Sequence, residues 1–299
     1  MTLHEPAARQ GALASSIDLT PQAPLPRGEG ERGIPQRQSP RAALLSYLRK
    51  TLNIAEWEAR KLRHDPTDLI TRTVQPMLWL LVFGEVFTRF RAIPTGHQSY
   101  LDFMSPGILA QSVLFISIFT GIATIWERDL GVIHKFLASP TPRGAIVLGK
   151  ALSAGVRALP QALIIYLLSL ALGVHMNWNP LAMIGVIVGV ILGAACFSTF
   201  SVIIACALRS RERVMGIGQV LTMPLFFASN AIYPISAMPG WLQVVARINP
   251  LSYDVDALRA VMLSGGTSVN GLWVDFAVLV AISAALIILC ARMYPKLVQ

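Results

Sequence analysis

The chain has 299 residues, of which 54% are hydrophobic and only 14% charged, and its mean hydropathy is +0.57. Soluble domains carry about 25% charged residues, so this composition excludes an ordinary soluble domain and indicates an integral membrane protein. The formal net charge of +9 could suggest a nucleic-acid partner, but the distribution of Lys and Arg along the chain indicates membrane topology instead.

The first 64 residues precede any apolar run that is long enough to cross a bilayer. Residues 1–40 are rich in Pro, Gly, Gln and Arg and lack a hydrophobic period, which predicts a disordered cytoplasmic tail. Between residues 41 and 64, apolar side chains such as Leu48, Leu52 and Ala55 recur at steps of four and three. This pattern predicts an amphipathic helix in the headgroup region, and a helix packed on another protein surface is the alternative.

Six apolar stretches follow, each close to the roughly 20 residues that cross a hydrocarbon core. They predict an all-α integral membrane domain over residues 65–299. Cys196, Cys206 and Cys290 fall inside these stretches, so we expect small buried side chains rather than a disulfide framework. The predicted spans lie near 72–92, 105–126, 150–173, 181–208, 214–235 and 272–291.

Lys and Arg are unevenly distributed between the two sets of connections that join these spans. One set is richer in cations at every crossing, and cytoplasmic loops are the ones that carry an excess of Lys and Arg. We therefore expect both termini and the connection 127–149 to lie in the cytoplasm. The richer set holds Lys61, Arg63, Arg72, Arg128, Lys135, Arg143, Arg209, Arg211, Arg213, Arg292 and Lys296, and the poorer set holds Arg89, Arg91, Arg247 and Arg259.

The most unusual connection is the segment 127–150, ERDLGVIHKFLASPTPRGAIVLGK, a short charged insert between two apolar stretches. Its last seven residues match the G-x-x-x-x-G-K skeleton of a phosphate-binding loop, but Ala151 stands where Ser or Thr would bind magnesium. No strand is expected before the segment, its interior is bulky and apolar, and it leads into a membrane helix. We therefore reject nucleotide binding here and expect ATP to bind to another chain.

The last outer connection, 236–271, predicts two short amphipathic helices rather than a plain loop. Asn249 suits a helix N-cap and Pro250 the first helical position, so we expect the break between the two helices there. Such re-entrant helices could dip into the outer leaflet and cover an exit path. The apolar face of the second helix comprises Leu251, Val255, Leu258 and Met262.

Three glycines, Gly185, Gly189 and Gly193, recur at intervals of four within the stretch 181–208 and therefore share one helix face. Small residues at this spacing let helix backbones approach closely. We favour a packing seam within the chain, and a dimer interface is the alternative.

Nothing in the sequence predicts a catalytic or metal site. The five histidines are scattered singly, without the paired spacing of zinc ligands. No G-x-S-x-G elbow is present, and we expect no pair of carboxylates in mid-membrane. An enzymatic function is therefore not expected.

Three blocks of the sequence, in this order on six predicted spans, resemble the permeases of the ABC-2 family of ABC transporters. Residues 62–87, LRHDPTDLITRTVQPMLWLLVFGEVF, are similar to the family's entry into the first span. The insert 127–150 is similar to its E-x-x-x-G … L-x-x-(S/T)-P … G-K stretch, and residues 224–265 resemble its closing block. The resemblance covers roughly residues 41–291.

This resemblance implies the permease subunit of an ATP-driven exporter in the bacterial inner membrane. ATP and Mg would bind to a separate ATPase subunit, and this chain would bind no cofactor or nucleic acid. Because the family works with twelve spans and two ATPases, six spans imply a dimer of permeases, most simply a homodimer. The cargo would be hydrophobic or amphiphilic: a drug, a lipid or a lipid-linked oligosaccharide.

The resemblance also assigns two sites. The insert would be a coupling helix that docks into a cleft of the ATPase, with Phe136 and Leu137 as apolar anchors, and a merely solvated turn is the alternative. The outer helices would form an extracytoplasmic gate. The expected ATPase contacts are Glu127, Arg128, Gly131, Lys135, Phe136, Leu137, Pro140 and Pro142, and the expected gate residues are Pro234, Pro239, Trp241, Asn249, Pro250 and Tyr253.

The main alternative function is a secondary transporter or channel. That class predicts internal repeats, interrupted helices, or a charged residue in mid-membrane that couples an ion. The sequence shows no clear repeat and predicts no central acid. Among exporters, the main rival to an amphiphilic cargo is a polysaccharide, which would require a continuous channel wide enough for sugar rings.

Overall fold

The computed structural model describes residues 47, 49–53, 56, 66–90, 99–133, 142–208 and 210–297. Helices account for most of this part of the chain, and its only β-structure is an isolated bridge between Met176 and Leu263. The predicted all-α class is therefore confirmed. The predicted tail 1–40 and most of the predicted interface helix 41–64 lie outside the described residues.

Four helices are long and apolar enough to cross a membrane, and they coincide with four of the six predicted spans. The longest has 30 residues and is about 45 Å long at 1.5 Å per residue. It therefore extends beyond a hydrocarbon core of about 30 Å. The four helices are α4 (Tyr100–Asp129), α6 (Arg143–Ala171), α7 (Pro180–Ala207) and α11 (Leu272–Met293).

The other two predicted spans fall on shorter elements. One is a helical run of α2 (Pro66–Leu78), the π-helical η1 (Trp79–Gly84) and α3 (Glu85–Phe90). The other is α8 (Arg211–Phe227), which has 17 residues and begins with three charged side chains. The number of six spans therefore stays a prediction.

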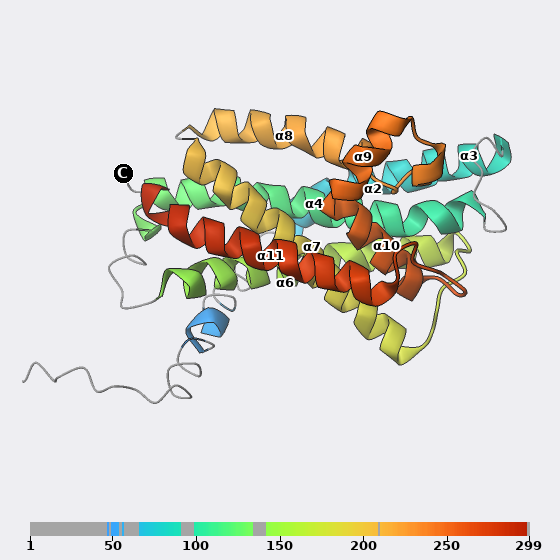
Figure 1. Ribbon diagram of the computed structural model, residues 1–299, viewed down its shortest axis with the longest axis horizontal. Coiled ribbons are helices and arrows are strands. Elements are labelled where there is room, and N and C mark those ends of the chain that lie inside the picture. Colours follow the sequence, from blue (N-terminus) through green and yellow to red (C-terminus); the bar gives the residue numbers. More distant parts are fainter. Residues whose placement is uncertain are drawn as a thin grey trace, which may run out of the picture. The chain divides into compact units, whose positions relative to one another are not determined.

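The helix α7 is central, because it packs against α4, α6 and α11 (Figure 1). The helix α4 contributes most to the core: every residue from Tyr100 to Leu114 is buried. A helix that is buried all round needs neighbours on every side, and α6, α7, α8 and α10 (Pro250–Met262) all contact α4. By contrast, α11 leaves much of its apolar surface exposed.

Three exposed tryptophans lie just before or at the start of helices at one end of the bundle. Trp178 precedes α7, Trp273 lies in the first turn of α11, and Trp241 lies in the first turn of α9 (Gly240–Ile248); all three are largely exposed. Tryptophan is enriched at membrane–water interfaces, where its ring is partly buried and its N–H meets water. These positions are typical of such an aromatic belt.

Candidate functional site

The helices α4 and α6 carry the two ends of the insert. After α4 ends at Asp129, Gly131 has a φ of 73°, a backbone conformation that favours glycine. Pro142 is the N-cap of α6, and its carbonyl oxygen accepts a hydrogen bond from the N–H of Ala145 at 2.9 Å. Four of the expected ATPase contacts lie outside the described residues: Lys135, Phe136, Leu137 and Pro140.

A buried ion pair joins these two helices at the root of the insert. The Nζ of Lys150, on α6, donates to the Oε2 of Glu127, on α4, and the residues are 4% and 7% exposed. Glu127 was expected to contact the ATPase, but its carboxylate faces α6 within the chain. Lys150, which ends the G-x-x-x-x-G-K match, is engaged in the same pair.

A second, more exposed cluster joins α4 to α8. Arg211 donates from Nε and Nη2 to Oδ2 of Asp129, at 2.8 and 2.6 Å. Arg128 donates from Nε and Nη2 to the other oxygen, Oδ1, at 3.0 and 2.9 Å. The guanidinium carbon of Arg211 also lies 6.0 Å from the centroid of the Trp126 ring. Beside this cluster, Leu130 is 77% exposed.

Tyr47, from the N-terminal part of the chain, lies near the start of α6. A Cβ added to Gly144, at the start of α6, would lie 2.9 Å from the hydroxyl oxygen of Tyr47. Burial raises the pKa of the Tyr47 phenol. The side chain of Tyr47 therefore lies close to the point where α6 begins.

On the opposite side of the bundle, α9 and α10 are separated at Asn249–Pro250, as predicted. The Oδ1 of Asn249 accepts a hydrogen bond from the N–H of Leu251 at 3.0 Å, which confirms the predicted N-cap. Its Nδ2 donates to the carbonyl oxygens of Leu225 and Ala228, at 2.7 and 2.9 Å. Asn249 thus caps α10 and also fixes the start of α10 to the end of α8.

The other expected gate residues lie along the same segment. Pro234 is the N-cap of the short helix η2 (Ile235–Ala237), and Pro239 is the N-cap of α9. The hydroxyl of Tyr253 donates to the carbonyl oxygen of Arg247 at 2.7 Å. On α9, an apolar stripe at helical spacing is exposed rather than packed: Trp241, Val244, Val245 and Ile248.

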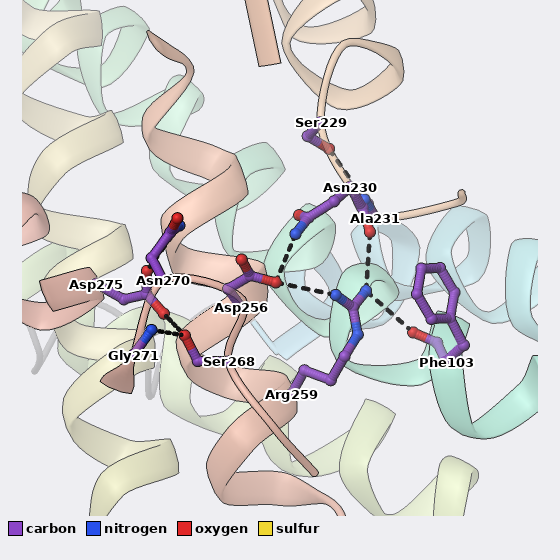
Figure 2. A network of polar contacts seen from close by, with 10 residues as sticks. All are labelled: Phe103, Ser229, Asn230, Ala231, Asp256, Arg259, Ser268, Asn270, Gly271 and Asp275. Carbon is purple, nitrogen blue, oxygen red and sulfur yellow. Dashed lines mark hydrogen bonds and ion pairs between the residues drawn. The ribbon is translucent and has the colours of Figure 1, made fainter. Parts of the chain in front are cut away.

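The helix α10 is almost wholly buried, and a polar network anchors it (Figure 2). Oδ1 of Asp256 accepts from Nδ2 of Asn230 at 2.6 Å and from Nη1 of Arg259 at 3.1 Å. Nη2 of Arg259 donates to the carbonyl oxygens of Asn230 and Phe103, at 2.8 and 3.3 Å. The guanidinium carbon lies 4.0 Å from the centroid of the Phe103 ring. The network therefore joins α10, the turn after α8, and α4.

This network corrects the sequence interpretation of Arg259. It was counted among the cations of an outer loop, but only 6% of the residue is exposed. The predicted apolar face of α10 is buried as expected, and Arg259 is buried with it because Asp256 and two carbonyl oxygens accept its hydrogen bonds. A buried charge is tolerated when it is paired in this way.

The glycines of α7 face α10. Cβ atoms added to Gly185 and Gly189 would lie 2.9 Å from the side chains of Val261 and Leu258, and one on Gly193 would overlap the carboxyl group of Asp254. Asp254 is fully buried, and neither of its oxygens has a hydrogen-bond partner among the described residues. Asp254 therefore lies against the middle of the candidate span α7, where the sequence reasoning did not expect an acid.

Sequence reasoning missed the pairs Asp256–Arg259 and Asp129–Arg211. The first pair had a local signal, because its members are three residues apart and so share a helix face. The second joins residues that are 82 positions apart, and nothing local relates them.

An apolar cavity of about 300 Å³ lies between α6 and α7. Its walls include Leu163 and Ile187, both of which are exposed at the surface of the chain. Tyr166 also lines it, and the Tyr166 hydroxyl is buried without a hydrogen-bond partner among the described residues. Such a cavity suits an apolar group rather than a charged one.

Known proteins match most of this chain. Residues 50–263 match the family described as ABC-2 type transporter. The chain is 27% identical over 288 residues to the daunorubicin resistance ABC transporter permease protein of Streptomyces coeruleorubidus, covering 96% of each protein. It is 26% identical over 204 residues to the probable doxorubicin resistance ABC transporter permease protein of Mycobacterium tuberculosis, covering 67% of this chain and 72% of the relative. Nodulation protein J of Rhizobium meliloti is 27% identical over 167 residues, or 55% of this chain and 63% of that protein.

Proposed function

This chain belongs to the ABC-2 type transporter family, and from that premise we propose how its parts couple ATP hydrolysis to export. The match over residues 50–263 carries the assignment, because it spans both the insert and the outer helices. The chain is the multi-pass permease subunit of an ABC exporter, and such permeases pair with a separate ATPase subunit. It is not itself an enzyme, and we assign ATP and Mg to the partner ATPase.

The insert between α4 and α6 is the proposed contact with the ATPase. Two observations support this assignment: its ends belong to adjoining helices, and the exposed Leu130 and the charged Arg128 stand at its root. Phe136 and Leu137 serve as apolar anchors, and Lys135 contributes a charge to the partner surface. We leave Glu127 out of the proposed contact, because its carboxylate is buried against Lys150.

The proposed topology has six spans, with α2–α3 and α8 completing the set, and both termini in the cytoplasm. Cations near the root of the insert, such as Arg128, Arg143 and Arg211, support this orientation, since cytoplasmic connections are richer in Lys and Arg. We further propose a tail over 1–40, an interface helix over 41–64 and a transmembrane domain over 65–299. Two copies of the permease would complete the transporter as a homodimer.

The proposed extracytoplasmic gate comprises α9 and the start of α10. Its exposed apolar stripe around Trp241 and Val244 is attached, through Asn249, to the end of α8. The proposed cargo is hydrophobic or amphiphilic and enters from the inner leaflet. The names of two relatives, which associate them with resistance to daunorubicin and doxorubicin, support this class over a polysaccharide.

Copurification with the ATPase tests the role of the insert. We expect the double change Phe136→Asp and Leu137→Asp to abolish recovery of the ATPase with the permease, because charged groups would replace the apolar anchors. Val269→Asp is the matched control, since Val269 is 78% exposed in the opposite set of connections and should leave the complex intact. An undiminished complex after the double change would remove the insert from the contact.

The orientation is tested separately by labelling with a membrane-impermeant thiol reagent. Cysteine placed at Leu130 should react only from the cytoplasmic side, and cysteine placed at Val269 only from outside. Both positions are largely exposed, and the three native cysteines are buried. The opposite pattern would invert the proposed topology.

A further inference from the structure

We infer that Asp129 and Arg211 form a clasp through which movement of the insert is carried along α8 to the outer gate. Both are positioning residues: neither is assigned a contact with cargo or nucleotide. The inference rests on the proposed function, since it takes the insert as the part that the ATPase moves.

The end of α4 is a rigid starting point for this clasp. The buried pair Glu127–Lys150 lies just before it and ties α4 to α6. Separating a buried pair leaves an unpaired charge and is strongly unfavourable. We therefore expect the end of α4 and the start of α6, which bracket the insert, to move together.

The clasp between Asp129 and Arg211 has two short hydrogen bonds, but both side chains are partly exposed. Oδ2 of Asp129 receives two donors from Arg211, and Oδ1 receives two from Arg128, so the carboxylate is held with one side toward α8. The side chains of Arg211 and Asp129 are 49% and 33% exposed. Exposed ion pairs form and break at little cost, so this pair can reorganise during a transport cycle.

The helix α8 continues from the clasp to the gate. Arg211 is its first residue, and its 17 residues extend over about 25 Å. At its far end, Leu225 and Ala228 offer their carbonyl oxygens to Nδ2 of Asn249, the residue that separates α9 from α10. A continuous set of contacts therefore links the root of the insert to the start of the gate, with the helix α8 between them.

The test measures whether the gate responds to nucleotide on the ATPase. Cysteine is placed at Val244, which is 57% exposed on α9, in a chain whose three native cysteines are replaced by alanine. The full complex is reconstituted, and the rate of reaction with an impermeant maleimide is compared without nucleotide and with ATP plus vanadate. We expect a nucleotide-dependent rate in the parental complex.

Asp129→Asn is expected to reduce that nucleotide response by about fivefold, the low end of typical coupling between distant sites, while the ATPase still copurifies. The reversed pair, Asp129→Arg with Arg211→Asp, should restore the response. Glu212→Gln is the matched control, because it removes a carboxylate from the same turn of α8 outside the clasp, and it should leave the response unchanged.

The inference is overturned if Asp129→Asn keeps the full response, if the reversed pair fails to restore it, or if the parental complex shows none. These results are separable from failure of the docking proposal. Docking fails only if the ATPase remains bound after Phe136 and Leu137 are changed, whereas every variant here retains both residues.

Discussion

In the proposed topology, the outer and inner ends of this permease hold their charged groups in different ways. At the outer end, Asp256 and Arg259 are buried, and carbonyl oxygens of two other segments accept hydrogen bonds from the guanidinium. At the inner end, Asp129 and Arg211 pair at the surface. A buried network has one favourable arrangement, whereas an exposed pair has several of similar free energy. From this contrast we expect the part of α10 that carries Asp256 and Arg259 to be a fixed anchor, and rearrangement to begin at the inner end.

The largest effect in this comparison is expected from Arg259→Ala. The change leaves Asp256 buried without its cation and should lower the free energy of unfolding by about 3–5 kcal/mol. Thermal denaturation of the detergent-solubilised protein would measure it. Arg247→Ala is the control, since Arg247 is exposed on α9 and its loss should change stability little. Equal stability of the two variants would show that the outer network is no anchor.

A smaller loss is expected from Gly193→Ala. The new methyl group would overlap the carboxyl group of Asp254, so this buried side chain or the helices α7 and α10 would have to shift, at a cost of about 1–3 kcal/mol. Gly216→Ala is the control, because nothing lies within 4 Å of a Cβ there and alanine favours the helix α8. The same denaturation measurement should show destabilisation at 193 and none at 216. A neutral result at 193 would contradict tight packing of α10 on α7.

The smallest effect is expected from Asn249→Ala, at about 1–2 kcal/mol, because the change removes a cap and two further hydrogen bonds. Asn179→Ala is the comparison variant, because it removes a similar helix cap. Asn179 also precedes a proline and caps α7, through a bond to the N–H of Leu181 at 3.0 Å, but it is exposed. It should therefore cost less than Asn249→Ala in the same assay. Equal losses would mean that the bonds to Leu225 and Ala228 contribute nothing.

The elements that the sequence predicted correctly are ones with a strong local signal. The length and apolarity of four stretches predicted α4, α6, α7 and α11, and the Asn249–Pro250 pair predicted the break between α9 and α10. Arg247 and Arg259 show where local signals stop. They are the same residue type in one connection, yet one is exposed and the other buried.

Contacts distant in sequence decide that difference. Arg259 is buried because Phe103 and Asn230, 156 and 29 positions away, offer carbonyl oxygens to it. Asp129 and Arg211 meet in the same way, across 82 positions. The spacing of Gly185, Gly189 and Gly193 similarly showed that a close helix approach was available, but not that α10 would be the partner. Such pairings depend on how helices are arranged in three dimensions, which periodicity does not encode.

The turn between α8 and η2 has a consequence for recombining this permease with its relatives. Arg259 holds the carbonyl oxygen of Asn230, and Asn249 holds those of Leu225 and Ala228, so the chain from 225 to 259 is tied to itself at both ends. Adding or removing a residue within it would shift these acceptors relative to their donors. Chimeras designed to exchange cargo preference should therefore transfer 225–259 as one cassette, with crossover points outside it.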